Sequence, residues 1–207
     1  MPRPRFAKLT REKQERILQA AAQQFATHGY ENASLNQILA EAGISKGAAY
    51  YYFDDKADLF ATAIRHYTTL LAGEAAHQPE VVTAETFWPH LRTRYQEQFQ
   101  LAQDKPWAFG LVKSAGRVGS ELLTRPELAA LMGEVRGWLG QIIQQGQALG
   151  VIRTDLPEDL LMNLFMAVDD GLDQWLLQHW DALDAAAIAE LSGKVLTGLQ
   201  QFLAPVE

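Results

Sequence analysis

Hydrophobic residues recur every three or four positions along almost the whole chain, and no stretch alternates between apolar and polar residues for the length of a strand. This spacing puts apolar side chains on one face of a helix, so it predicts an all-α fold. Capping residues and glycines divide the chain into about nine helices. We expect a three-helix domain at the N-terminus, joined to a larger helical bundle.

The helices at the N-terminus are marked by clear start and stop signals. Thr10 is the expected N-cap of the first helix, and Ser34 is the expected N-cap of a second helix of about two turns that ends at Gly43. Ser45 caps a third short helix over residues 46–52. Two short helices joined by a glycine-containing turn form a helix-turn-helix, although an ordinary helical hairpin within a core has the same pattern.

The later helices also begin at recognisable signals. Asp55 is expected to cap a long fourth helix, and residues 107–123 read as one irregular helix that contains several glycines. Thr124 and Asp155 each precede a proline and a glutamate, which predicts a capping box with proline in the first turn of two further helices. The last helix is expected over residues 184–203.

Composition narrows the possible chemistry. The chain has 207 residues, of which 48% are hydrophobic and 21% are charged, as in ordinary globular proteins. It has no cysteine, which excludes disulfides, thiol nucleophiles and cysteine-ligated zinc. No apolar run reaches the roughly 18 residues of a membrane span, so we expect a cytoplasmic protein with no membrane partner.

The net charge of −7 is unevenly distributed. Residues 1–66 carry nine basic and seven acidic residues, whereas the remainder carries nine basic and eighteen acidic residues. The first sixteen residues include six cations, which suggests an anionic partner for this end of the chain. Two alternatives remain for this basic arm: a contact with a DNA minor groove, or an untethered tail.

The segment SLNQILAEAGISKGAAYYYFDDKADLF, residues 34–60, resembles the DNA-binding region of the TetR family of transcriptional regulators. The likeness extends over about residues 10–64, and the rest of the chain matches only in helix count, length and acidic character. The resemblance implies a homodimeric repressor, released from a palindromic double-stranded DNA operator by a small, mainly apolar effector. It also implies a helix-turn-helix domain over residues 1–52 and a ligand-binding and dimerisation domain over residues 53–207.

The resemblance also indicates which residues contact DNA. Tyr50 and Tyr51 are similar to positions whose phenols donate to phosphate, and Lys46 is a partner for phosphate or a guanine edge. Ala48 stands at a common base-contacting position with only a methyl group, so no base preference is carried over. The full predicted set is Ser34, Ser45, Lys46, Gly47, Ala48, Tyr50, Tyr51, Tyr52 and Lys56.

The remainder of the chain is rich in aromatic residues, most of which we expect in the core. Because the family keeps its effector pocket in this region, the resemblance implies a ligand site among some of these residues. The long helices over residues 155–180 and 184–203 are apolar on more than one face, which predicts that they pair in a dimer, with Leu199 and Phe202 on the shared face. The predicted ligand-binding set is Trp88, Tyr95, Phe99, Trp107, Phe109, Trp138 and Phe165.

One enzyme hypothesis competes with this interpretation. Asp169, Asp170 and Asp173 match the DDxxD pattern with which some all-α enzymes hold magnesium for diphosphate substrates. The chain lacks a second acidic motif of this kind, a GxSxG nucleophile elbow and histidines at metal-ligand spacing. We therefore predict a protein that is not an enzyme, with no catalytic residues, no metal and no cofactor, and keep the magnesium-dependent enzyme as the alternative.

Overall fold

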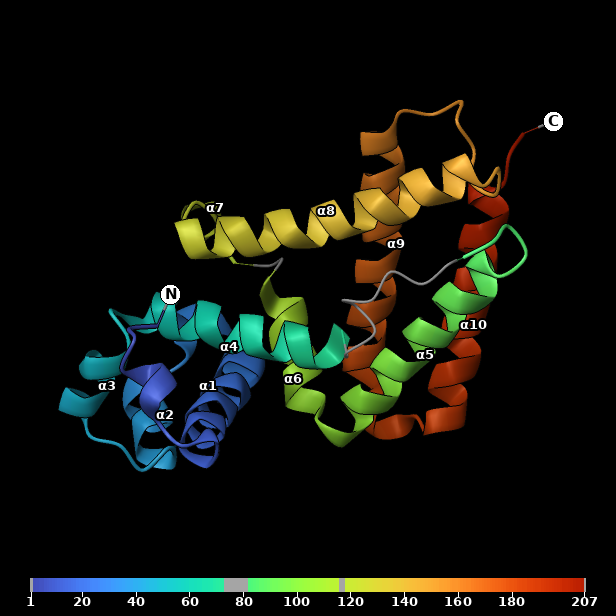
Figure 1. The fold of residues 1–207 in the computed structure, drawn as a ribbon. Coiled ribbons are helices and arrows are strands. Elements are labelled where there is room, and N and C mark those ends of the chain that lie inside the picture. Colours follow the sequence, from blue (N-terminus) through green and yellow to red (C-terminus); the bar gives the residue numbers. More distant parts are fainter. Residues whose placement is uncertain (1, 73–81, 116–117, 207) are drawn as a thin grey trace. The chain divides into compact units, whose positions relative to one another are not determined.

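The computed structural model describes residues 2–72, 82–115 and 118–206, and within these ranges it contains helices and no strand (Figure 1). The predicted all-α fold class is confirmed. Ten α-helices are present in the described ranges where about nine were expected, because residues 107–123 form two helices rather than one. None of the helices in these ranges is both long enough and apolar enough to cross a lipid bilayer.

The elements follow one another with short connections. In chain order they are η1 (Phe6–Lys8), α1 (Arg11–Asn32), α2 (Leu35–Glu41), α3 (Lys46–Tyr52), α4 (Lys56–Ala72), α5 (Phe87–Asp104), α6 (Pro106–Ser114), α7 (Ser120–Leu123), α8 (Pro126–Ala148), α9 (Glu158–His179), η4 (Trp180–Ala182) and α10 (Ala185–Leu203).

The chain packs into two compact units. The N-terminal unit consists of Met1–Glu74 and Lys105–Leu131, and the C-terminal unit consists of Ala75–Asp104 and Met132–Glu207. Packing therefore groups α4 and α6 with the first three helices, because both lie against α1. The predicted division at residue 52 concerns function and stays a prediction.

The predicted N-caps of the first three helices are confirmed. The side chains of Thr10, Ser34 and Ser45 each accept a hydrogen bond from a backbone N–H in the first turn of the following helix. Such a cap contributes about 1 kcal/mol to helix stability. Gly29 and Gly43 have φ values of 70° and 63°, in the left-handed region that favours glycine. Local chemistry thus defines α1, α2 and α3.

An aromatic cluster holds the N-terminal unit together. The Phe60 side chain is fully buried, and its ring centroid lies 4.8 Å from that of Phe25 and 5.1 Å from that of Tyr30. Near the start of α1, the Glu15 carboxylate accepts a hydrogen bond from the Tyr67 hydroxyl (3.1 Å) and pairs with the Lys105 ammonium at 3.6 Å. These contacts attach α4 and the start of α6 to α1.

The two predicted capping boxes at Thr124 and Asp155 are wrong. The Thr124 hydroxyl donates to the Glu121 carbonyl at the end of α7. Both Asp155 carboxylate oxygens accept from the Arg153 guanidinium, at 2.7 and 2.6 Å. The first residue of α9 instead follows Pro157, which provides no side-chain cap. Helix α8 begins at Pro126, so Thr124 lies one residue too early to be its N-cap, and Arg153 occupies both oxygens with which Asp155 was expected to cap α9.

The C-terminal unit has an apolar core built from α5, α8, α9 and α10. Gly146 in α8 is required by this packing, since a Cβ atom there would lie 2.5 Å from Ile152 Cδ1 and 2.8 Å from Phe87 Cζ. Any side chain at this position forces the neighbouring groups apart. The buried members of the core cluster are Phe87, Leu139, Ile143, Ile152, Leu161 and Leu203.

Candidate nucleic-acid interface

Helices α2 and α3 form a compact helix-turn-helix. The turn is closed by a backbone hydrogen bond from the Ile44 N–H to the Leu39 carbonyl (3.0 Å), and Gly43 supplies the left-handed conformation that the turn requires. The Ser45 hydroxyl oxygen then accepts from the Ala48 N–H (3.2 Å) and starts α3. Seven-residue helices of this kind depend on their caps and on packing, because neither is long enough to be stable alone.

Helix α3 separates its anchoring side chains from its exposed ones. Ala49 on the helix and Phe53 directly after it are 4% and 3% exposed, so they fix α3 against the rest of the unit. Tyr50 and Tyr51 are 45% and 48% exposed, and Lys46 is also exposed. Two large phenols held in water beside a cation suit a partner that offers both apolar contact and anionic oxygens, as a DNA backbone does.

The two serines that are predicted to contact DNA can still donate a hydrogen bond to it. The hydroxyl oxygens of Ser34 and Ser45 accept cap hydrogen bonds at 3.3 and 3.2 Å, which leaves each O–H available to donate. Gly47 is exposed and Ala48 is half-buried on the same helix. The structure thus brings most of the predicted set together on α3 and at the starts of α2 and α3.

Tyr52 and Lys56 have contacts that the sequence did not reveal. The half-buried Tyr52 ring lies 6.3 Å from the Phe6 ring between centroids, which favours packing over base readout. The Lys56 ammonium donates to the Glu31 and Ala33 carbonyls at 3.1 and 3.0 Å, at the C-terminal end of α1. Lysine is favourable at that end of a helix. An additional contact between Lys56 and phosphate stays a prediction.

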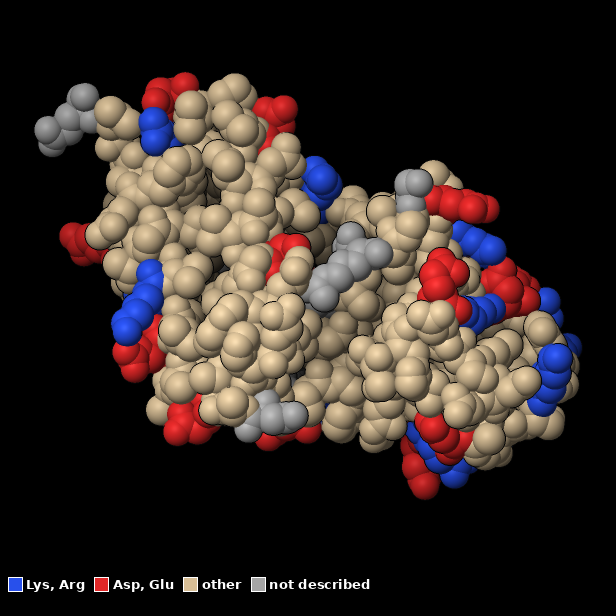
Figure 2. Space-filling view, turned by 180° about the vertical axis from the view of Figure 1, so that it is seen from behind, with Lys and Arg blue, Asp and Glu red and all other residues tan. Residues whose placement is uncertain are grey.

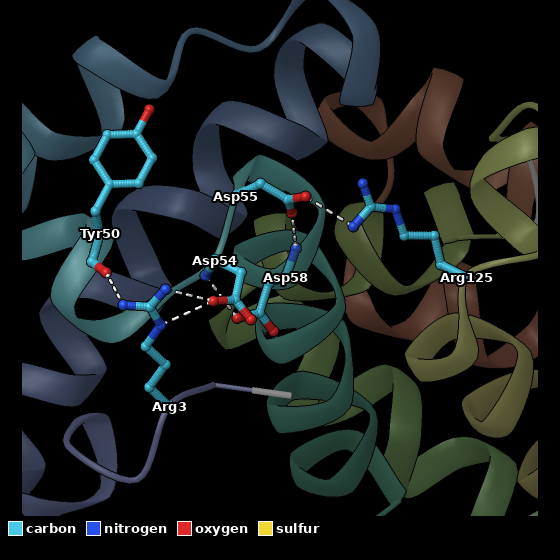
Figure 3. A network of polar contacts seen from close by, with 6 residues as sticks. All are labelled: Arg3, Tyr50, Asp54, Asp55, Asp58 and Arg125. Carbon is cyan, nitrogen blue, oxygen red and sulfur yellow. Dashed lines mark hydrogen bonds and ion pairs between the residues drawn. The ribbon is translucent and has the colours of Figure 1, made fainter.

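Three aspartates follow α3, and ion pairs with arginines balance the negative charges of two of them (Figure 3). The Asp54 carboxylate pairs with Arg3 at 2.7 Å, and the Asp55 carboxylate pairs with Arg125 at 2.8 Å. The Asp58 carboxylate accepts from the Asp54 N–H (3.1 Å). Burial raises the pKa of Asp55, but hydrogen bonds from the Asp58 N–H and the Arg125 guanidinium outweigh it and hold this pKa below its ordinary value. Pairing limits how strongly these carboxylates repel an anionic partner.

The charge asymmetry of the sequence is visible on the surface. On the face drawn in Figure 2, Lys and Arg side chains gather over the N-terminal unit, at the right, among acidic ones. The C-terminal unit, at the left, shows mainly acidic side chains on that face. An anionic ligand is therefore favoured at the N-terminal unit.

The predicted ligand-binding residues fall into both packing units. Trp107 and Phe109 belong to the N-terminal unit, and the other five belong to the C-terminal unit. Within the latter, Trp88 and Phe165 pack against the apolar core cluster, whereas Trp138 is 43% exposed. The seven residues thus do not form one site within a single unit, and a role for each of them in ligand binding stays a prediction.

The aspartate run on α9 is not arranged as a metal site. The Tyr95 hydroxyl donates to the Asp169 carboxylate at 2.6 Å, the Gln174 amide donates to Asp170 at 2.7 Å, and Asp173 is only 1% exposed. Burial and the nearby charges of Asp169 and Asp173 raise the pKa of Tyr95, so its phenol remains a neutral donor. No group of three or more possible metal-binding side chains occurs among the residues that the structure describes. The magnesium-dependent enzyme hypothesis is not supported.

Comparisons with known proteins agree with this geometry. Residues 17–63 match the model of the bacterial regulatory proteins of the tetR family. The HTH-type transcriptional repressor AcnR of Corynebacterium glutamicum is 28% identical over 172 residues, which cover 79% of this chain and 81% of that protein. The probable acrEF/envCD operon repressor of Escherichia coli K12 is 25% identical over 169 residues, which cover 80% of this chain and 74% of that protein.

A solved structure extends the likeness to the whole fold. The transcriptional regulator FadR from Bacillus subtilis, in complex with stearoyl-CoA, superposes with a TM-score of 0.71 at 20% identity and covers 89% of this chain and 96% of that one. The matching family model spans the helix-turn-helix described above, and the curated relatives span about four fifths of the chain. By its helix-turn-helix region and its overall fold, this chain is similar to the TetR family of bacterial regulatory proteins.

Proposed function

We propose that this protein is a cytoplasmic transcriptional repressor that binds operator DNA through α3 and is released by a small, mainly apolar ligand. The observation that carries the proposal is the capped helix-turn-helix whose second helix exposes Lys46, Tyr50 and Tyr51 while Ala49 is buried. A helix held in this way enters a major groove without changing its own packing. The names of the curated relatives, which include repressors, support the direction of regulation.

A homodimer forms part of this proposal. Leu160, Leu164, Val168 and Trp175 are 36 to 42% exposed and follow one another at helical spacing along one face of α9. A row of large apolar side chains in water is typical of a surface that pairs with another protein. Leu199, predicted on the shared face, is only 6% exposed and belongs to the core of its own unit, whereas Phe202 is 42% exposed. We therefore assign the dimer face chiefly to α9.

The effector is expected among α5, α8 and α9. Trp88 and Phe165 border an apolar core there, and the Tyr95–Asp169 hydrogen bond places a polar pair in the same unit. Apolar walls with few polar groups are usual for small-molecule sites. The FadR structure, which holds stearoyl-CoA, supports a ligand with a long apolar part. The ligand would release DNA by favouring a conformation that binds it poorly.

DNA binding can be tested through Lys46 and Tyr51. We expect Lys46→Gln to lower the slope of log affinity against log salt concentration by about one, because one phosphate contact is lost. Tyr51→Phe should weaken binding to all sequences by a similar factor, since a phosphate contact carries no sequence information. Fluorescence anisotropy with a duplex selected from a random pool measures both effects. Arg136→Gln, which removes an exposed charge on α8, is the matched control.

Wild-type affinity and an unchanged salt slope in both variants would remove these residues from the interface. Failure of the wild-type protein to enrich any duplex from the pool would contradict the proposed function itself.

Ligand binding can be tested with stearoyl-CoA and a panel of other apolar molecules as probes. We expect at least one probe to raise the thermal midpoint and to lower DNA affinity. A probe that prefers the non-binding conformation tenfold shifts the equilibrium by about 1.4 kcal/mol. Phe165→Ala should weaken the response to this probe more than Trp138→Ala, because Phe165 is packed inside the unit and Trp138 is exposed. If every stabilising probe leaves DNA affinity unchanged, the site is not regulatory.

A further inference from the structure

The basic N-terminal arm is attached to the C-terminal end of α3. The Arg3 backbone N–H donates to the Tyr52 carbonyl (2.8 Å), and the Arg3 Nη1 donates to the Tyr50 carbonyl (2.7 Å). These carbonyls lie in the last turn of the helix, where no intrahelical N–H remains to satisfy them. The same guanidinium also pairs with Asp54 (2.7 Å), as Figure 3 shows. The arm is thus tethered, unlike the free tail considered from sequence.

An apolar anchor fixes the next residues of the arm. Phe6, the first residue of η1, is 5% exposed. Its ring centroid lies 4.9 Å from that of Phe53, which directly follows α3. Burial of a phenylalanine side chain is favourable, so this contact helps to order the short arm. Arg5 and Lys8, on either side of the anchor, are therefore held beside α3.

A shallow hollow lined by basic residues lies between the docked arm and α3. The Arg5 guanidinium lies over the Tyr51 ring, 3.7 Å from its centroid. The hollow has a volume of about 450 Å³, and no acidic residue is among those that line it. Arg3 is engaged by Asp54, but no acidic group pairs with Arg5 or Lys8 within the ranges that the structure describes. The lining residues are Arg3, Pro4, Arg5, Lys8 and Tyr51.

We propose that this hollow binds a phosphate of the DNA backbone, and that it adds a contact from the arm to those made by α3. A guanidinium offers two parallel N–H donors to a phosphate, an ammonium adds a point charge, and a phenol adds one O–H donor. Arg5, Lys8 and Tyr51 supply these three groups. The proposal rests on the proposed function, since it requires that α3 binds DNA.

The arm and the recognition helix share Tyr51. Stacking against Arg5 restricts the orientation of the Tyr51 ring, so the phenol is already ordered before DNA binds. Arg3 does not contribute to the phosphate contact directly, because its donors are directed to carbonyls and to Asp54. It is a positioning residue that keeps Arg5 beside α3.

The decisive experiment removes charges from the protein and from the DNA in combination. A duplex selected by the wild-type protein is synthesised with one methylphosphonate at a time, so that each variant duplex lacks a single phosphate charge. We expect one position in each half-site at which neutralisation weakens the wild-type protein but not Arg5→Gln. Arg5→Gln should also lower the salt slope by about one, which corresponds to about three- to fourfold in affinity between 50 and 200 mM salt. Arg136→Gln serves as the charge control.

The variant Arg3→Gln tests whether Arg3 positions Arg5 for the phosphate contact or only stabilises the structure of α3. We expect it to abolish the coupling between Arg5 and its phosphate, while the coupling between Lys46 and its own phosphate remains. Loss of both couplings would mean that α3 itself is distorted, and would overturn the positioning role of Arg3.

Three outcomes would contradict the phosphate site. If every methylphosphonate has the same effect on Arg5→Gln as on the wild-type protein, the arm does not contact the DNA backbone. If inorganic phosphate perturbs the NMR signals of Arg5 and Tyr51 at low concentration while the methylphosphonate pattern is unchanged, the hollow binds a free anion instead. If the wild-type protein selects no duplex at all, the proposed function fails, and this site fails with it.

Discussion

We expect Leu164→Glu to convert the protein into a monomer and to lower its affinity for a palindromic operator by at least about 100-fold. Leu164 lies in the middle of the exposed apolar face of α9, between Leu160 and Val168. A carboxylate there has to be buried without a partner if the dimer forms, and this cost exceeds what a few apolar contacts provide. Without the dimer, the second half-site is no longer bound intramolecularly, and the gain from effective concentration is lost.

The control for this experiment is Thr154→Glu, which adds the same charge at an exposed position in the loop before α9. Light scattering at micromolar concentration measures the oligomeric state, and anisotropy measures operator affinity. A Leu164→Glu protein that remains dimeric, or a monomer that binds the full operator as tightly as the wild-type protein, would show that α9 is not the dimer face.

The second large effect is expected for Phe60→Ala, which should lower the free energy of unfolding of the N-terminal unit by about 3 to 5 kcal/mol. Phe60 is fully buried between the rings of Phe25 and Tyr30, and its removal leaves a cavity in the centre of the unit. Since proteins are stable by only about 5 to 15 kcal/mol, this loss is a large share of the total. DNA binding should fail at temperatures at which the wild-type protein binds well.

Hydrogen exchange measured by mass spectrometry shows where this change acts. Peptides from α1 to α4 should exchange much faster in Phe60→Ala, while those from α9 and α10 should keep their protection. Phe60→Leu retains most of the volume and should cost less than about 2 kcal/mol. If both substitutions have equal effects, cavity formation is not the cause.

The sequence predicted those features that depend on neighbouring residues. Ser34, Ser45 and Asp184 each accept from a backbone N–H three residues ahead, so their helix starts were recognisable from local pattern alone. The fold class was predictable for the same reason, because the three- to four-residue spacing of apolar residues is also a local pattern.

Features that depend on distant partners were not predictable. Asp155 was expected to cap α9, but its carboxylate binds the Arg153 guanidinium, which the distant carbonyls of Phe202 and Leu203 help to position. Lys56 donates to carbonyls of residues more than twenty positions earlier in the chain. Arg3 contacts residues near position 50, and nothing in its local sequence indicates that it is docked. Only the apolar Phe6 in an otherwise basic arm signalled a packed segment.

The division of α3 into anchoring and exposed positions has a consequence for engineering. The packing of the helix depends on Ala49 and on Phe53, and both are almost inaccessible to solvent. Gly47 and Ala48 lie near the solvent side and have small side chains, so larger or polar residues there can be accommodated without disturbing that packing. A library randomised at these two positions should therefore yield folded variants with new operator preferences, which makes this helix a suitable scaffold for orthogonal genetic switches.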